Sequence, residues 1–179
     1  MKIAGILDNS LSNGKGMRTV IFTSGCSHNC PKCHNKELQD INSGIDMDIE
    51  EILERIQKNV GIISGVTISG GDPFYQPQDL LILLKEIKYR FKDLNVWVYT
   101  GYTYEELIDN SLLLSSLSLK YIDVLVDGRY VDQLNPNNYS YEEVKNNSEL
   151  QKPCKYKGSV NQRILRLEEG KIKEELYFE

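Results

Sequence analysis

Residues 26–33 read Cys26-Ser27-His28-Asn29-Cys30-Pro31-Lys32-Cys33, and His34 follows directly. This segment holds three of the four cysteines of the chain, in a C-x3-C-x2-C spacing. Three thiolates this close together indicate a metal site or a redox site rather than packing alone. They leave one iron of a four-iron cluster without a cysteine, and an open coordination position is typical of a reactive metal centre. We therefore expect Cys26, Cys30 and Cys33 to hold a [4Fe-4S] cluster, with a Cys3His zinc site completed by His34, or simple redox or packing thiols, as alternatives.

The composition is that of an ordinary globular protein. The 179 residues are 40% hydrophobic and 26% charged, which suggests a single domain spanning residues 1–179. The net charge of −5 argues against a protein that grips nucleic acid through a basic surface. The longest apolar run, residues 80–84, is too short to span a membrane, and no N-terminal signal is visible. Clustered cysteines without such a signal predict a cytoplasmic, reducing environment.

Strand and helix patterns alternate along most of the chain. We expect strands at residues 18–23, 66–68, 95–99 and 121–126, and helices at 49–60, 77–91, 103–108 and 112–119. A possible edge strand at 2–7 and a loop at 9–16 precede them, and strands at 159–167 and 171–178 follow. This order predicts an α/β fold with a parallel sheet. Because a full eight-fold barrel typically needs ~250 residues, we expect an incomplete β/α barrel of mainly parallel strands.

One long segment, residues 128–159, lacks a clear pattern. It is polar, rich in Asn, Tyr, Ser and Lys, and has only a weak helical signal near residues 141–145. A loop of this length is either functional or mobile. It also carries the remaining cysteine, Cys154, which we expect to be a free thiol.

Small or polar residues follow each of the four predicted parallel strands. They are Gly25 beside the cysteines, Gly70-Gly71-Asp72, Thr100-Gly101 and Asp127-Gly128. The carboxyl ends of parallel strands meet at one edge of a sheet, where glycine lets a ligand approach the backbone. A Gly-Gly-Asp-Pro turn alone would only connect a strand to a helix. Its position after the cysteine loop favours a polar small molecule held beside the cluster.

The cysteine motif after the first buried strand, with Gly70-Gly71-Asp72 after the second, resembles the radical S-adenosylmethionine enzymes. More narrowly, the chain is similar to the anaerobic ribonucleoside-triphosphate reductase-activating proteins over residues 2–167. Four segments carry this resemblance: Asn13-Gly14 with Gly16-Met17-Arg18-Thr19-Val20, Gly25-Cys26 through Cys33-His34-Asn35, Asp123-Val124-Leu125-Val126-Asp127-Gly128, and Gly158-Ser159 with Asn161-Gln162-Arg163.

The resemblance implies a mechanism. Cys26, Cys30 and Cys33 would each bind one iron, and the fourth iron would bind S-adenosylmethionine. One electron, from a flavodoxin-like or other low-potential donor, would cleave the sulfonium to methionine and a 5′-deoxyadenosyl radical. That radical would take a hydrogen atom from a glycine of the large reductase subunit, the expected partner. An activase of a different glycyl-radical enzyme and a small-molecule radical S-adenosylmethionine synthase remain alternatives, as does a non-enzymatic zinc module.

The resemblance also implies ligand contacts, but it names no catalytic side chain, because the cofactor carries the chemistry. Gly70, Gly71 and Asp72 would hold the methionine amino group. Lys32, Cys33 and His34 would border the adenine, although many members of the superfamily have an aromatic residue in place of Lys32. The ribose and carboxylate contacts would come from Thr100 and Gly101 and from Asp127, Gly128 and Arg129. Asn161-Gln162-Arg163 could equally dock a partner or complete the sheet.

Overall fold

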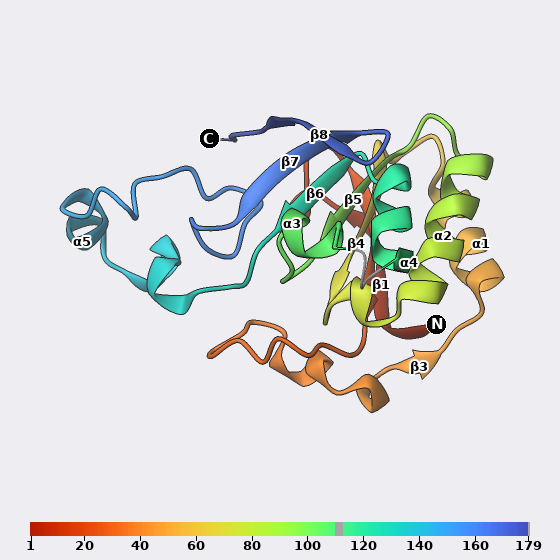
Figure 1. Cartoon of the computed structure of the whole chain (residues 1–179), viewed down its shortest axis with the longest axis horizontal. Coiled ribbons are helices and arrows are strands. Elements are labelled where there is room, and N and C mark those ends of the chain that lie inside the picture. Colours follow the sequence, from red (N-terminus) through yellow and green to blue (C-terminus); the bar gives the residue numbers. More distant parts are fainter. Residues whose placement is uncertain (110–112, 179) are drawn as a thin grey trace.

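The computed structural model describes residues 1–109 and 113–178 and places eight strands of this part of the chain in one mixed sheet (Figure 1). The strands are β1 (Lys2–Ser10), β2 (Arg18–Thr23), β3 (Ile45–Asp46), β4 (Gly65–Gly70), β5 (Asn95–Tyr99), β6 (Val124–Asp127), β7 (Arg163–Glu168) and β8 (Lys171–Glu175). Their order across the sheet is β3-β1-β2-β4-β5-β6-β7-β8. The four central strands, β2, β4, β5 and β6, are parallel, and the flanking pairs on both sides are antiparallel.

Helices cover one face of the sheet. Figure 1 shows α1 (Ile49–Asn59), α2 (Pro77–Arg90) and α4 (Leu113–Ser118) together beside the strands, while the short α3 (Tyr104–Leu107) follows β5. The apolar face of α1 is buried at Ile52, Leu53 and Ile56, and the backbone N–H of Asp48 donates to Glu51 at its start. These side chains belong to one core with the inward residues of α2 and of the central strands. No helix in the two described stretches is long and apolar enough to cross a membrane.

The second face of the sheet has a smaller core around Trp97. Val124, Val126 and Ile164 are buried beside it, and Phe178 of the C-terminal segment packs on the indole ring with centroids 5.9 Å apart. The loop between β1 and β2 also reaches this face. A Cβ atom added to Gly14 would lie 2.9 Å from the Trp97 ring, so only glycine allows this close approach. Turn and tail segments, rather than helices, therefore cover this side.

The structure confirms the mixed α/β fold and most predicted elements, and it corrects the predicted sheet. Parallel strands form only its centre, because β1 and β7 each return antiparallel to a neighbour. The predicted strand 121–126 begins only at Val124, since the Ile122 amide donates to Leu119 and closes a 3-10 turn. The predicted strand 159–167 begins at Arg163, and the one at 171–178 ends at Glu175. Of the predicted helix 112–119, Leu112 lies outside the described residues.

The long segment 128–159 is folded into short turns and one short helix, α5 (Tyr141–Lys145), which Figure 1 shows far from the helical layer. Hydrogen bonds close its base. Gln162 Nε2 donates to the carbonyl of Gly128 at 2.8 Å, and Asn161 Nδ2 donates to that of Arg129 at 2.9 Å. The two ends of the segment are thereby fixed to each other beside the carboxyl end of β6.

Candidate active site

The cysteine loop starts where β2 ends and is anchored at its base by backbone hydrogen bonds. The amide of Gly25 donates to Leu38 O at 2.8 Å, and the amide of Cys26 donates to Gln39 O at 3.0 Å. Within the loop, Asn29 and Lys32 have positive φ angles of 48° and 54°, which turn the chain sharply between the cysteines. The loop therefore returns to its starting point and presents its three thiols from one compact segment.

A buried histidine–aspartate pair fixes the loop to the sheet. His28 Nε2 and Asp72 Oδ2 are 2.8 Å apart, and the two side chains are only 4% and 2% exposed. The Asp72 carboxylate also accepts from Thr100 Oγ1 at 2.9 Å and from the amides of Gly101 and Phe74, both at 2.9 Å. A buried carboxylate with this many donors is fully satisfied. Asp72 thus ties the cysteine loop, the end of β4 and the end of β5 together.

Glycines make this close packing possible. A Cβ atom on Gly71 would lie 2.4 Å from the carbonyl oxygen of Gly25, and one on Gly101 would lie 2.4 Å from the His28 ring. The amides of Gly71 and Asp72 donate to Thr23 O and Gly25 O, both at 2.8 Å. Because these amides are already used, the turn can offer a ligand carbonyl oxygens, which accept hydrogen bonds from an ammonium group.

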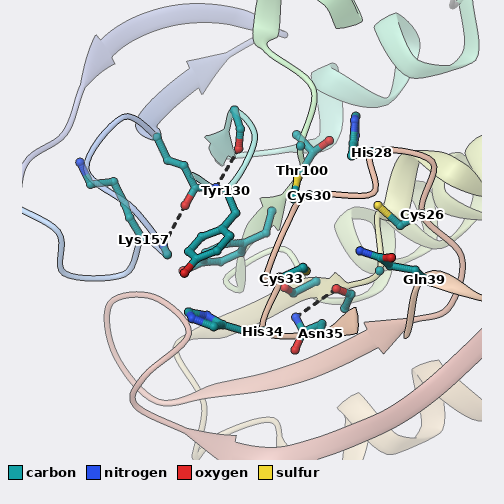
Figure 2. A pocket seen from close by; sticks show the side chains of 18 of the residues that line it. Cys26, His28, Cys30, Cys33, His34, Asn35, Gln39, Thr100, Tyr130 and Lys157 are labelled. Carbon is teal, nitrogen blue, oxygen red and sulfur yellow. Dashed lines mark hydrogen bonds between the residues drawn. The ribbon is translucent and has the colours of Figure 1, made fainter. Parts of the chain in front are cut away.

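The three thiols line a cavity of about 330 Å³ at the carboxyl ends of the parallel strands (Figure 2). Several residues predicted from the sequence line the same cavity: Cys26, Cys30, Cys33, His34, Gly70, Gly71, Thr100, Gly101 and Gly128. Burial raises the pKa of the Cys26 and Cys30 thiols. Metal binding at neutral pH must therefore displace protons from these thiols.

The donor set fits an iron–sulfur cluster. The described lining residues include three thiols and no Asp or Glu, and soft thiolate donors select iron–sulfur clusters or zinc over hard cations. Among residues 1–109 and 113–178, no group of three or more His, Cys, Asp or Glu side chains that could hold a metal ion is found. The three thiols line one cavity of about 330 Å³. The predicted zinc ligand His34 instead lies 3.4 Å from the amide nitrogen of Asn135 and packs on Tyr130.

Four of the predicted ligand-binding residues do not line the cavity. Lys32 has a side chain that is 77% exposed and pairs with Asp132 at 2.9 Å, while Arg129 is exposed and lies 3.8 Å from Glu106. Asp72 is buried in the network described above. Asp127 is buried at the end of β6, two strands away from β4 in the sheet. Their contacts with a ligand stay predictions.

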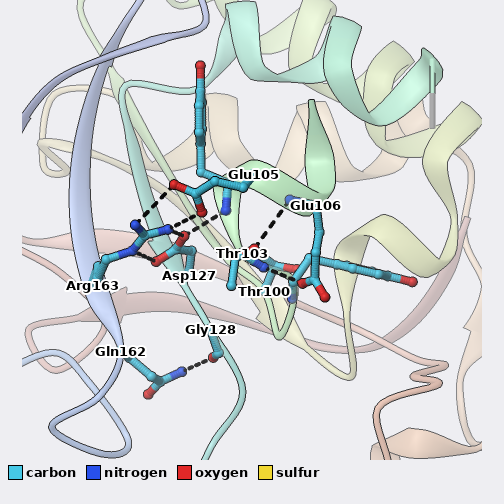
Figure 3. A network of polar contacts seen from close by, with 10 residues as sticks. Thr100, Thr103, Glu105, Glu106, Asp127, Gly128, Gln162 and Arg163 are labelled. Atoms are coloured by element: carbon cyan, nitrogen blue, oxygen red, sulfur yellow. Dashed lines mark hydrogen bonds and ion pairs between the residues drawn. The ribbon is translucent and has the colours of Figure 1, made fainter. Parts of the chain in front are cut away.

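Asp127 belongs to a second polar network, shown in Figure 3. Its carboxylate accepts from Arg163 Nε at 3.0 Å and from the amide of Tyr104 at 2.7 Å. Arg163 continues to Glu105, where Nη2 and Oε2 are 2.7 Å apart. The predicted Asn161-Gln162-Arg163 motif therefore joins β7 to β6 and to the base of the long segment, which favours its predicted role in completing the sheet.

Several residues that line the cavity were not predicted to contact a ligand: Ser12, Asn13, Asn35, Gln39, Ser69, Tyr99, Tyr130, Tyr156, Lys157, Gly158 and Gln162. Four of these, Asn13, Asn35, Gly158 and Gln162, belong to the segments that carry the family resemblance. The alternation of β5 places Tyr99 on the same face as Trp97, so strand periodicity could have identified it. Asn35 lies next to the motif and donates to Gly70 O at 3.1 Å. Tyr130, Tyr156 and Lys157 come from the long polar segment, where no periodicity marks them.

The fold and site define a class: an α/β protein that presents three thiols of one loop to a cavity at the ends of parallel strands. Residues 12–165 match a family described as "4Fe-4S single cluster domain". The anaerobic ribonucleoside-triphosphate reductase-activating protein of Pasteurella multocida (strain Pm70) is 38% identical over 124 residues, 66% of this chain and 77% of the relative. Relatives of the same name occur in Escherichia coli (strain K12), 37% identical over 68% of this chain and 80% of the relative, and in Enterobacteria phage T4, 33% identical over 68% and 76%.

The chain belongs to this family of anaerobic ribonucleoside-triphosphate reductase-activating proteins. Membership confirms the family recognised from the sequence motifs, and with it the expectation of an iron–sulfur activating enzyme.

Proposed function

We propose that this protein binds a [4Fe-4S] cluster and S-adenosylmethionine and generates a glycyl radical on an anaerobic ribonucleoside-triphosphate reductase. The observation that carries the proposal is the cavity lined by Cys26, Cys30, Cys33 and the glycines that end β4 and β5. The names of the relatives supply the class of protein that is activated. When bound, the cluster would supply the electron that cleaves the sulfonium.

The residues of this chain bind, orient and shield. Three thiolates would hold three irons, and no fourth cysteine lines the described cavity, so S-adenosylmethionine would bind the remaining iron. Carbonyl oxygens of Gly70 and Gly71 would accept from the amino group of the ligand. His28, held by Asp72, fixes the loop so that the thiols stay in place, and Thr100, Gly101 and Gly128 border the remaining part of the ligand.

The proposed arrangement of the sheet is an incomplete barrel within a single domain of 179 residues. The outer strands β3 and β8 each pair on one side only, so the sheet is not closed on itself. An open barrel suits a protein substrate, because a glycine-bearing loop of the reductase has to reach the cavity. We further propose a cytoplasmic location, which provides the reducing conditions that a cluster requires, and a flavodoxin-like or other low-potential electron donor.

The test of function is direct. The reduced protein, S-adenosylmethionine and the large reductase subunit are mixed under argon, and the expected result is a glycine-centred doublet in the electron paramagnetic resonance spectrum. The reductase is first shown to be active with another activase. If it then gives no doublet with this protein, the proposed partner is wrong.

The cluster is tested separately with Cys30→Ala. We expect this variant to lose its iron and its cleavage of S-adenosylmethionine, because a three-thiolate site has no spare ligand. Cys154→Ala is the matched control, since Cys154 lies outside the cavity lining and should keep about four irons per chain. Full iron content in Cys30→Ala, or one zinc in the wild-type protein, contradicts the cluster assignment.

A further inference from the structure

The described part of the cavity wall contains five aromatic rings that could hold a flat base: His28, His34, Tyr99, Tyr130 and Tyr156. If the ligand is S-adenosylmethionine, as proposed above, its adenine ring needs such a surface. The inference rests on that proposed function and concerns which of these rings receives the base.

Three of the five rings pack against rings that do not line the cavity. His28 is held by Asp72 and packs edge-on against Tyr102, with centroids 4.4 Å apart. Tyr156 packs edge-on against Trp97 at 5.8 Å and against Phe178 at 5.3 Å. Tyr99 lies in the same cluster around Trp97. His34 and Tyr130 remain, as neighbours with centroids 4.8 Å apart and planes tilted by 49°.

The orientation of the Tyr130 ring is fixed by hydrogen bonds of its hydroxyl and by close packing at its edge. Its hydroxyl donates to Asp132 Oδ1 at 3.1 Å and accepts from Asn135 Nδ2 at 3.3 Å. Gly158 leaves room for the ring, because a Cβ atom there would lie 3.0 Å from a Tyr130 ring carbon. A ring whose orientation is set in advance loses little conformational entropy when a base stacks on it.

The cysteine loop contributes to this placement through Lys32. Its ammonium group pairs with Asp132 Oδ2 at 2.9 Å, and the other oxygen of Asp132 accepts from Tyr130. Tyr130 therefore lies beside the loop that carries the thiols, across the cavity from Thr100 (Figure 2). The side chain of Lys32 itself points to solvent and offers no flat surface.

We propose that Tyr130, with His34 beside it, is the surface on which the adenine ring of the bound nucleotide stacks. The aromatic contact thus comes from the long segment 128–159 and not from position 32 of the cysteine motif. This gives the first part of that segment a role in ligand binding.

The test compares Tyr130→Leu, Tyr130→Phe and the matched control Tyr139→Leu by calorimetry with the cluster-loaded protein. Tyr139 lies in the same segment, but its hydroxyl donates to Gln133 O away from the cavity. Stacking of a base on an aromatic side chain corresponds to about a 10- to 100-fold change in affinity. We expect Tyr130→Leu to bind S-adenosylmethionine and 5′-deoxyadenosine more weakly by this factor. Tyr130→Phe should stay within about threefold of wild type, and Tyr139→Leu should be unchanged.

Methionine, which has no base, separates stacking from a general loss of structure. Its affinity, together with the iron content, should be the same in Tyr130→Leu as in wild type. Unchanged binding of 5′-deoxyadenosine by Tyr130→Leu overturns the inference, as does an equal loss of methionine binding. If the cluster-loaded wild-type protein binds no S-adenosylmethionine at all, the proposed function fails first, so the two failures are distinguishable.

Discussion

Asp72, which follows β4, and Asp127, which ends β6, are buried carboxylates that are each only 1% exposed. The family resemblance implies that both contact the ligand, and the structure gives each a role within the protein. Asp72 orients His28, and Asp127 accepts from Arg163 and from the backbone of α3. Removing one partner of such a pair leaves a buried charge unpaired, which is costly. Substitutions at these positions therefore test folding before they test ligand binding.

Glu105, which pairs with Arg163 in the network around Asp127, gives a prediction for the pH dependence of stability. The hydrogen bond from Arg163 lowers the pKa of Glu105 from its ordinary value of 4.5. A lowered folded-state pKa contributes stability that is present above the unfolded value and is lost as the pH falls through the folded value. Because Glu105 is 60% exposed, we expect Glu105→Gln to lower the unfolding free energy at pH 7 by no more than about 1 kcal/mol.

The expected difference between Glu105→Gln and wild type vanishes below the lowered pKa. Urea unfolding of both proteins between pH 7 and pH 3 measures it. A difference that stays constant over this range would show that the variant loses packing and not an ion pair.

Tyr99 gives a prediction of the opposite sign. Its hydroxyl oxygen exposes less than 1 Å² and has no hydrogen-bond partner among the described residues. Since an unsatisfied buried polar group is unfavourable, Tyr99→Phe should raise the unfolding free energy by about 1 kcal/mol. Tyr104→Phe is the control, because it loses a bond to Gly170 O at 3.0 Å and should lower stability by about 1 kcal/mol. Urea unfolding that finds Tyr99→Phe less stable than wild type would reveal a partner for this hydroxyl.

Among the elements, the long segment divides into two parts. Residues 129–138 contact the cysteine loop, because Asp132 pairs with Lys32 and Asn135 lies 3.4 Å from His34. Residues 139–150 instead line a separate pocket around α5. The capping box of α5 joins Ser140 and Glu143, so this part supports its own short helix. We therefore expect residues 129–138 to support the cysteine loop and residues 139–150 to contribute little to it.

Replacement of residues 139–150 by a short Gly-Ser linker tests this division. We expect unchanged iron content and a melting temperature within a few degrees of wild type, because this part buries little of the main core. Association with the reductase should weaken if this exposed helix takes part in docking. Iron analysis, thermal unfolding and a pull-down with the reductase measure the three properties. Loss of iron would show that α5 supports the cysteine loop.

Local sequence patterns predicted some elements of the fold and not others. Helical periodicity located α1 and α2, and β-branched or aromatic runs located the four parallel strands, because each pattern reflects burial within a single element. The clustered cysteines and the strand-end glycines likewise located the cavity, but they account for fewer than half of its lining residues. The antiparallel flanks, the loop over Trp97 and the position of Tyr130 depend on contacts between segments far apart in the chain. Nothing in a local pattern encodes these contacts.

The molecule as a whole has two differently covered faces. Helices bury one face, while the other has Arg18 and Trp97 beneath a loop and the C-terminal segment. Arg18 is fully buried, and its guanidinium donates to neutral oxygens of Thr67, Val66, Asn95 and Lys15. Burial lowers the pKa of Arg18 to about 10, so the group stays charged at neutral pH. The burial of Arg18 and Trp97 on this face therefore depends on the loop and the C-terminal segment that cover them.

Phe178→Ala tests that dependence. The half-buried ring packs on Trp97, the single tryptophan of the chain, and on Tyr156. We expect the tryptophan emission to shift to the red and the unfolding free energy to fall by about 2 kcal/mol, less than for a fully buried phenylalanine. Phe178→Leu, which keeps most of the apolar volume, should show smaller changes. An unshifted emission spectrum would mean that the tail does not shield the indole.

The clasp between His28 and Asp72, with the backbone bonds at Gly25 and Cys26, involves protein atoms only. These contacts would therefore position the thiols for the proposed cluster whether or not it is bound. We expect the loop to keep this arrangement when exposure to air removes the iron, so that iron and sulfide can be added back to the same polypeptide.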